Sequence, residues 1–230
     1  MAKCLLCGCS IFQPLTLEWL LSLQPVQLPV VCPACQKEFE TLRGQMVCPG
    51  CGRLQKNEDL CPDCQRWSKM GELELLNNRA LYRYDQAMKD YMQRYKFAGD
   101  YRFRLVFQDQ FSRFVQEKSD PHRVLVLIPV DEQTKRKRGF NQVQGLLAGF
   151  NALQLLAFRQ KEERVKQSTK TRKARMETRQ PFVYAGKKDL NGQEILLVDD
   201  IYTTGRTLYH AKHILQEHGA GAVHSLTLAR

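Results

Sequence analysis

From residue 81 onward, the hydrophobic positions switch between a helical period and continuous aliphatic runs. Helical spacing, with apolar residues three or four positions apart, recurs in four segments, Met88–Tyr95, Phe107–Val115, Val143–Phe150 and Leu208–Leu215. Aliphatic runs at Val124–Val130 and Ile195–Val198 are typical of strands buried on both faces of a parallel sheet, and 222–229 reads as a last strand. The alternation of strands and helices predicts a doubly wound α/β sheet.

Composition divides the chain of 230 residues into three regions, which are cysteine-rich (1–66), polar (67–80) and α/β-like. We therefore expect a small module over residues 1–79 and one larger domain over residues 80–230. The net charge of +11 favours an anionic partner without identifying it. The apolar runs are too short to cross a bilayer, and no signal peptide is visible, so we expect a cytoplasmic protein without membrane insertion.

All nine cysteines lie within the first 64 residues. Eight of them form Cys-x-x-Cys pairs, namely Cys4/Cys7, Cys32/Cys35, Cys48/Cys51 and Cys61/Cys64. A two-residue spacer lets both thiolates reach one ion, and two pairs complete a tetrahedral site. Without an export signal, reduced thiolates that hold metal are favoured over disulfides. We therefore expect one or two structural zinc sites, whose binding energy would largely fold the module.

The pairing of the cysteines is less certain in the first half than in the second. Nine residues separate Cys51 from Cys61, which is typical of a compact zinc ribbon. A 24-residue insert separates Cys7 from Cys32, and a crossed arrangement, in which the first and third pairs share a metal, stays open. An iron–sulfur cluster also uses four thiolates. Cys9 is left over, and we interpret it as a buried or idle thiol.

The segment 195–207 carries the strongest functional pattern. A buried strand runs into Asp199 and Asp200, at the end of the sheet where ligands of open α/β proteins bind. Adjacent carboxylates at the end of an apolar strand are costly unless a ligand uses them. The two carboxylates can accept hydrogen bonds from the hydroxyl groups of a ribose diol, and a divalent cation would relieve the repulsion between them.

A short loop then opens a helix, where backbone N–H groups and the helix dipole favour a phosphate. Gly205 permits a close approach of the backbone. The other candidate phosphate-binding residues are Thr203, Thr204, Arg206 and Thr207. A Walker-type loop is absent from the sequence.

This segment resembles the phosphoribosyl pyrophosphate (PRPP) signature of type I phosphoribosyltransferases. The chain as a whole resembles the ComF family of competence-associated, phosphoribosyltransferase-like proteins. The matching pieces are the Cys-x-x-Cys series, Tyr84 with Lys96–Asp100, Ile128–Val130, Arg138–Gln142 and Val198–Thr207.

The resemblance implies a type I phosphoribosyltransferase-like parallel sheet flanked by helices, with a small N-terminal Cys4 zinc module. It implies that Asp199 and Asp200 hold PRPP with Mg²⁺, and that Arg138–Gln142 lies near its pyrophosphate end, with Arg138 and Gly139 as the favoured contacts. It also implies a role in DNA uptake during natural transformation, together with a helicase-like ATPase of the ComFA type that helps to draw in single-stranded DNA.

Two basic stretches are candidates for binding nucleic acid. Lys135, Arg136 and Lys137 precede Arg138, either as a solvated loop or as contacts to an anionic ligand. Residues 159–179 contain nine Lys and Arg against three Glu, including Lys170, Arg172, Lys173 and Arg175. This stretch can close over pyrophosphate, bind nucleic-acid phosphate independently of sequence, or simply keep the surface soluble. It has no interleaved aromatic residues for base stacking.

Three functions agree with these features. The first is a competence protein that binds PRPP or nucleotide and single-stranded DNA and works with the helicase. The second is an active phosphoribosyltransferase that transfers ribose 5-phosphate to an unidentified nitrogen acceptor, with Asp199, Asp200 and Arg138 as its catalytic residues and positioning as its main source of rate. The third is a regulator that uses the fold only to sense the ligand.

Overall fold

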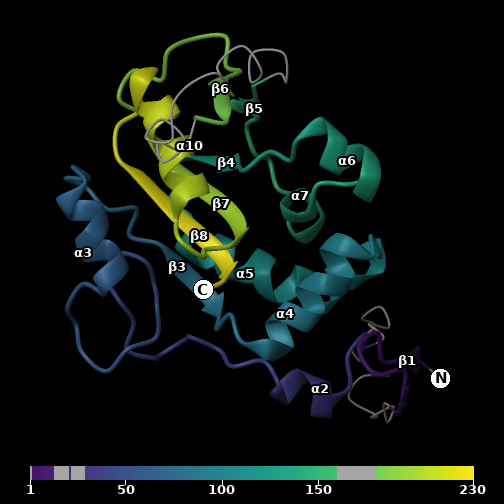
Figure 1. Cartoon of the computed structure of the whole chain (residues 1–230). Helices are drawn as coiled ribbons and strands as arrows, with labels where there is room; N and C mark the ends of the chain where they lie inside the picture. Colours follow the sequence, from purple (N-terminus) through teal and green to yellow (C-terminus); the bar gives the residue numbers. More distant parts are fainter. Residues whose placement is uncertain (1, 13–20, 22–28, 160–179) are drawn as a thin grey trace, which may run out of the picture.

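The structure is a computed structural model that describes residues 2–12, 21, 29–159 and 180–230. Its centre is a parallel sheet of four strands in the order β3 (Arg79–Tyr82), β8 (Val223–Ala229), β7 (Glu194–Ile201) and β4 (Arg123–Leu127). The pairing register places Leu125 beside Leu196, and Val198 beside Leu226. The predicted parallel α/β sheet is confirmed (Figure 1).

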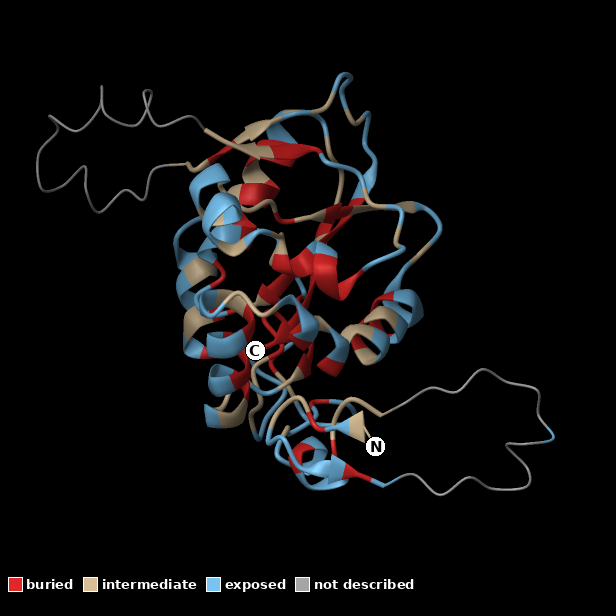
Figure 2. Ribbon diagram, turned by 90° about the vertical axis from the view of Figure 1, so that its right-hand side faces the viewer, coloured by how far each residue is buried: buried red, intermediate tan, exposed pale blue. Residues whose placement is uncertain are grey.

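Strand β7 shows why a continuous apolar run was needed. Ile195 and Leu197 pack into the buried cluster on one face of the sheet, and Leu196 and Val198 pack into the cluster on the other. The two-residue period of a strand sends successive side chains to opposite faces, so both sets must be apolar. Figure 2 shows this buried layer running through the middle of the molecule.

One face of the sheet is covered by helices that carry the predicted apolar stripes. These are α4 (Gln86–Met92), a π-helix (Gln93–Phe97), a 3₁₀-helix (Tyr101–Val106), α5 (Gln108–Lys118) and α7 (Gln142–Leu146). As expected, the Asp85 carboxylate caps the first of them by accepting from the Met88 N–H at 3.0 Å. Helix α7 is shorter than the predicted segment, which extended to Phe150.

The other face is covered by α10 (Arg206–Glu217), by the hairpin of β5 (Leu156–Phe158) and β6 (Phe182–Tyr184), and by the second cysteine group. Helix α6 (Glu132–Arg138) lies beyond the carboxyl end of β4. Lys135–Lys137 therefore belong to a helix, and the alternative of a solvated loop is wrong for them. The Asp131 carboxylate caps it through the Thr134 N–H, and Gly139 ends it with φ of 84°.

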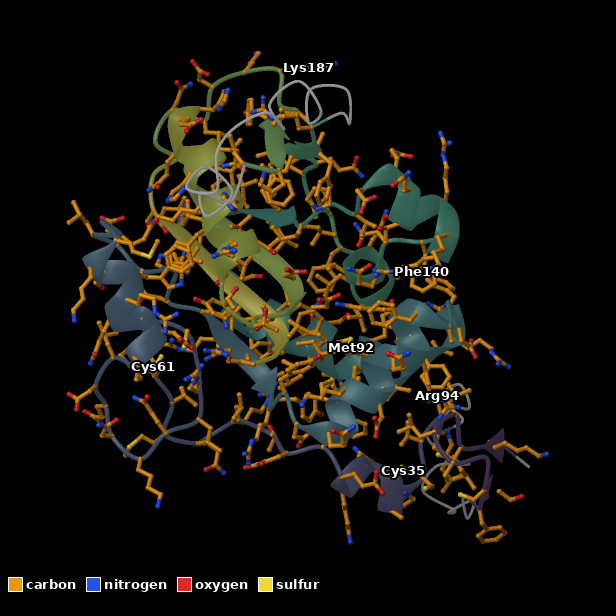
Figure 3. The ribbon with its side chains drawn as sticks, viewed as in Figure 1. Cys35, Cys61, Met92, Arg94, Phe140 and Lys187 are labelled. Atoms are coloured by element: carbon orange, nitrogen blue, oxygen red, sulfur yellow. The ribbon has the colours of Figure 1, made fainter. Side chains whose placement is uncertain are left out.

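The cysteine-rich region separates into two parts in space. The first contains β1 (Ala2–Lys3), β2 (Ser10–Ile11) and α2 (Pro33–Lys37), and the second contains α3 (Pro62–Lys69). Figure 3 shows Cys35 and Cys61 on opposite sides of the molecule. Arg94 donates to the Leu5 and Leu6 carbonyls at 3.1 and 2.6 Å, which ties the first part to the π-helix.

The polar composition of the segment 67–80 indicates a connector, and the structure shows that part of this segment is buried. Leu76 and Asn78 are fully buried in it. The Asn78 amide donates to the Cys51 carbonyl at 3.1 Å and to the Thr227 hydroxyl at 3.2 Å, and it accepts from Ser225 at 2.9 Å. A buried amide with these partners satisfied fixes the second cysteine group to the sheet. The division at residues 79/80 stays a prediction.

Among the described residues, no helix combines the length and the apolar character that crossing a bilayer requires.

Candidate functional site

The two adjacent carboxylates lie within strand β7, near its carboxyl end, and not in the loop after it. Asp199 is 8% exposed and Asp200 is 3% exposed. Asp199 also accepts a hydrogen bond from the Asp200 N–H at 2.8 Å. Burial, followed by the charge of Asp200, raises the pKa of Asp199 to about 8. A carboxyl whose pKa is raised by burial and by a second nearby charge marks a candidate functional site.

Lys96 compensates the charge of Asp200. Its Nζ lies 2.7 Å from Asp200 Oδ2, and the two side chains are 15% and 4% exposed. Asp200 points to the face of the sheet that α4 covers, and Lys96 reaches it from the π-helix that continues α4. A π-helical turn widens the helix locally and is frequent at functional sites. Sequence reasoning quoted Lys96 only within a family motif and gave it no role.

The candidate phosphate loop connects β7 to α10. Gly205 has φ of 82°, and a Cβ there would lie 2.2 Å from the Tyr202 hydroxyl oxygen. Only glycine fits this position, since both its backbone angle and its contact with the ring exclude a side chain. Thr203, Thr204, Arg206 and Thr207 are exposed, so their side chains are open to a ligand.

The segment Arg138–Gln142 lies beside the segment Lys96–Asp100. The Arg138 guanidinium sits over the Phe97 ring at 5.5 Å, and a Cβ on Gly99 would lie 3.7 Å from the Arg138 carbonyl oxygen. The two motifs that the sequence places about 40 residues apart therefore meet in the fold.

Aromatic and amide contacts hold this arrangement at the edge of the sheet. The Phe140 ring stacks on Tyr95 at 5.2 Å, and the Tyr95 hydroxyl donates to the Gln142 carbonyl at 2.8 Å (Figure 3). The Asn141 amide donates to the Ile128 carbonyl at 3.3 Å, just after β4. Arg138 is thereby linked, through Phe97 and its neighbour Lys96, to the carboxylate of Asp200.

The candidate nucleic-acid residues fall into two groups. Lys135, Arg136 and Lys137 are exposed on α6, next to Arg138. The other four, Lys170, Arg172, Lys173 and Arg175, lie outside the described residues.

A cavity of about 640 Å³ lies between α6, α7 and strand β5. Its walls include Gly139, Phe140, Asn141 and Phe158. It adjoins the Arg138–Gln142 segment, and neither Asp199 nor the loop Thr203–Thr207 lines it. The sequence indicated no pocket for an acceptor, because the cavity forms only when the stretch 127–158 folds back on itself and on Tyr101.

The eight paired cysteines form two uncrossed groups. Cys4, Cys7, Cys32 and Cys35 make one group, Cys48, Cys51, Cys61 and Cys64 make the other, and the sulfur atoms of each lie within 4.8 Å of one another. The uncrossed pairing settles the alternative that the spacing had left open. Cys9 is exposed, so of the two alternatives, a buried or an idle thiol, the buried one is wrong.

Both groups have the geometry that zinc requires. Tetrahedral bonds of about 2.3 Å place sulfur atoms about 3.8 Å apart. The sulfur of Cys7 lies 3.8 Å from that of Cys32, and the sulfur of Cys48 lies 3.7 Å from that of Cys64. Backbone N–H groups of Cys32 and Cys61 donate to the sulfur atoms of Cys4 and Cys48, each at 3.3 Å. Each group could therefore hold a structural zinc ion.

The parallel sheet, the acidic pair of β7 and the glycine-containing loop that opens α10 together define a phosphoribosyltransferase-type domain. Residues 137–230 match the family described as phosphoribosyl transferase domain. Over 99% of its length, the chain is 39% identical to the competence protein ComFC of Streptococcus pneumoniae, all of which is covered. It is 34% identical to the competence protein ComFC of Bacillus subtilis, with 99% of this chain and 94% of the relative covered. The chain belongs to the ComFC family.

Proposed function

We propose that the protein acts in the cytoplasm during DNA uptake in natural competence. In this proposal it binds PRPP, or a related nucleotide, together with Mg²⁺, it binds single-stranded DNA, and it works with a helicase of the ComFA type. The competence role rests on the similarity to two competence proteins along the whole chain. The ligand rests on the buried acidic pair Asp199/Asp200 beside an open phosphate loop.

Each part of PRPP has a chemically matched group in the site. The carboxylates of Asp199 and Asp200 would accept hydrogen bonds from the ribose hydroxyls, and Mg²⁺ would offset the repulsion between the two carboxylates. The exposed hydroxyls and N–H groups of Thr203–Thr207 would hold the 5-phosphate. Arg138 and Gly139 would lie at the pyrophosphate, where a guanidinium binds phosphate oxygens in pairs. Lys96 offers a second cation close to the same carboxylates.

Single-stranded DNA has a candidate surface beside this site, which we name the aromatic–basic edge (Phe97, Tyr101, Arg104 and Lys135–Arg138). Phe97 is 64% exposed and Tyr101 is 43% exposed. The Arg104 guanidinium lies over Tyr101 at 4.4 Å, and Lys135–Lys137 are exposed next to Arg138. Exposed rings for bases and cations for the backbone are the combination by which proteins bind single strands without sequence preference.

The DNA proposal is tested by the salt dependence of binding to a labelled oligothymidine, followed by fluorescence anisotropy. Each phosphate contact contributes about 0.7 to the slope of log K against log salt for single strands. We expect Lys135→Ala/Arg136→Ala to reduce that slope by about 1.4. The control is Arg113→Ala/Lys118→Ala, which removes two exposed cations from α5. Equal slopes of log K against log salt in the two variants would refute the proposal that the aromatic–basic edge binds single-stranded DNA.

The helicase partnership is tested by co-elution of the full chain with a ComFA-type helicase. We expect a complex that survives Lys135→Ala/Arg136→Ala, because docking would use the cysteine modules and not the DNA surface. The absence of any complex at micromolar concentrations would contradict the partnership and leave the ligand proposal standing.

A second candidate function is an active phosphoribosyltransferase, which the cavity beside Arg138–Gln142 favours. Its volume of about 640 Å³ lies in the range of small-molecule sites, and Phe140 and Phe158 give it apolar walls suited to a planar base. Release of pyrophosphate from PRPP in the presence of a nitrogen base would support this function. If no purine, pyrimidine or amine acceptor gives release while PRPP binds, the binding role remains.

A further inference from the structure

Two side chains next to the second cysteine group hold the backbone of the candidate phosphate loop. The indole N–H of Trp67 donates to the Thr204 carbonyl at 2.9 Å. The Arg230 guanidinium donates through Nη1 to the Thr203 carbonyl at 3.0 Å and to the Tyr202 carbonyl at 3.3 Å. Three successive carbonyls at the start of the loop are thus held from the same side.

Both side chains are themselves anchored to the cysteine group. Arg230 donates through Nη2 to the Cys51 sulfur at 3.3 Å and lies 3.6 Å from the Asp63 carboxylate. The Arg230 side chain is only 7% exposed, so the buried positive charge needs these acceptors to offset the cost of its burial. Trp67 lies one helical turn after Cys64 on α3, and its ring packs on Tyr209 of α10 at 4.2 Å.

A further ion pair joins the same module to α10. Lys212, which is 3% exposed, lies 2.9 Å from Glu72, and Glu72 also contacts His213. The second cysteine group is therefore attached both to the loop and to the helix that the loop opens.

Holding these carbonyls fixes the direction of the N–H groups that would meet a phosphate. In a planar trans peptide, the C=O of one residue and the N–H of the next point in opposite directions. The carbonyls of Tyr202, Thr203 and Thr204 point to Arg230 and Trp67, so the N–H groups of Thr203, Thr204 and Gly205 point away from them. Within the described part of the chain, these three N–H groups donate to no protein acceptor.

We propose that Trp67 and Arg230 are positioning residues that attach the phosphate loop to the second cysteine group and so restrict its motion. We call these two side chains and their hydrogen bonds to the loop the brace. They orient the three N–H groups toward the ligand before it binds. Preorganised donors lose no further freedom on binding, so the brace raises affinity without touching the ligand. The identity of the ligand rests on the proposed function, whereas the order of the loop does not.

The test uses the full zinc-loaded chain and Trp67→Phe, which keeps the ring against Tyr209 but removes the indole donor. The first readout is the ¹⁵N backbone order parameter of residues 203–205, without ligand. We expect values of about 0.85 in the wild type and below about 0.6 in the variant. The second readout is the Kd for PRPP with Mg²⁺, which we expect to rise about fivefold for one lost hydrogen bond.

Two further variants separate the brace from general damage. Arg230→Lys keeps the charge, but a single ammonium cannot bridge the Cys51 sulfur and the two carbonyls, so it should loosen the loop as well. Arg79→Gln is the matched control, because Arg79 donates to the Pro49 carbonyl of the same module at 2.9 Å and does not contact the loop. We expect wild-type order and affinity for it.

Unchanged order parameters in Trp67→Phe and Arg230→Lys would overturn the inference. Loosening in Arg79→Gln as well would overturn it too, since the effect would then come from the module as a whole. If the wild type binds no PRPP but the loop loosens in Trp67→Phe and Arg230→Lys alone, the ligand proposal fails and the brace stands.

Discussion

Replacing Lys96 by methionine removes the cation from a buried ion pair while keeping most of the apolar volume of the side chain. Asp200 would remain 3% exposed at the end of an apolar strand, next to Asp199, which is itself 8% exposed. Removing one partner of a buried pair costs about 3–5 kcal/mol, because the remaining charge stays in a medium of low polarity. Since Lys96 keeps 15% of its surface in water, we expect the lower end, about 3 kcal/mol.

The assay is urea unfolding at pH 7, followed by circular dichroism, on single and double variants. Lys96→Met/Asp200→Asn removes both charges, so most of the lost stability should return, with a coupling energy of about 2–3 kcal/mol. Lys89→Met is the control, because Lys89 is exposed on α4, and its effect should stay within about 0.5 kcal/mol. A loss below about 0.5 kcal/mol in Lys96→Met, or no recovery in the double variant, would refute the ion pair as a stabilising contact.

Three other substitutions have expected outcomes. Gly205→Ala places a Cβ 2.2 Å from the Tyr202 hydroxyl at a φ of 82°, so thermal unfolding should show a loss of about 2 kcal/mol or more, and titration calorimetry should show weakened PRPP binding. Asp199→Asn removes a carboxyl whose pKa rises to about 8 on folding. The folded wild type keeps this proton up to about pH 8, whereas the unfolded chain loses it at about pH 4. Between these two pH values, thermal melts should show that the stability of the wild type falls relative to that of the variant, by at most about 1.4 kcal/mol per pH unit. Gly50→Ala places a Cβ 2.8 Å from the Cys64 sulfur, so metal analysis should find about one zinc ion per chain instead of two; two ions held as tightly as in the wild type would contradict the close packing of that centre.

The sequence predicted those parts of the fold that depend on local pattern. The run Ile195–Val198 identified the central strand because both faces of that strand are buried, and the Cys-x-x-Cys spacing identified the eight clustered thiols. The acidic pair and Gly205 were visible because charge after an apolar run and glycine before a helix are local signals. Helix α6 was not predicted, although its capping Asp131 and its terminal Gly139 were also local signals; for Lys135–Lys137 the basic composition left a solvated loop and a ligand contact as alternatives.

Contacts between distant segments could not be predicted in this way. Lys96 reaches Asp200 only because a π-helical turn and the sheet order bring them together across about 100 residues. Trp67 lies 137 residues before its partner Thr204, and Arg230 lies 27 residues after its partner Thr203. The burial of Leu76 and Asn78 comes from strand β8 and the second cysteine group, which are distant in sequence from Leu76 and from Asn78. A sequence pattern records which residues are apolar or charged, but the partner of each charge is set by the tertiary fold.

Calorimetric titration of PRPP with Mg²⁺ into the wild type and into Asp199→Ala/Asp200→Ala decides whether this site binds a ribose phosphate. Circular dichroism and zinc content establish beforehand that both proteins are folded and loaded. We expect micromolar binding, about −8 kcal/mol, in the wild type and none in the variant. No heat in the wild type, or equal binding in both proteins, would contradict the assignment of Asp199, Asp200 and Thr203–Thr207 as a PRPP site.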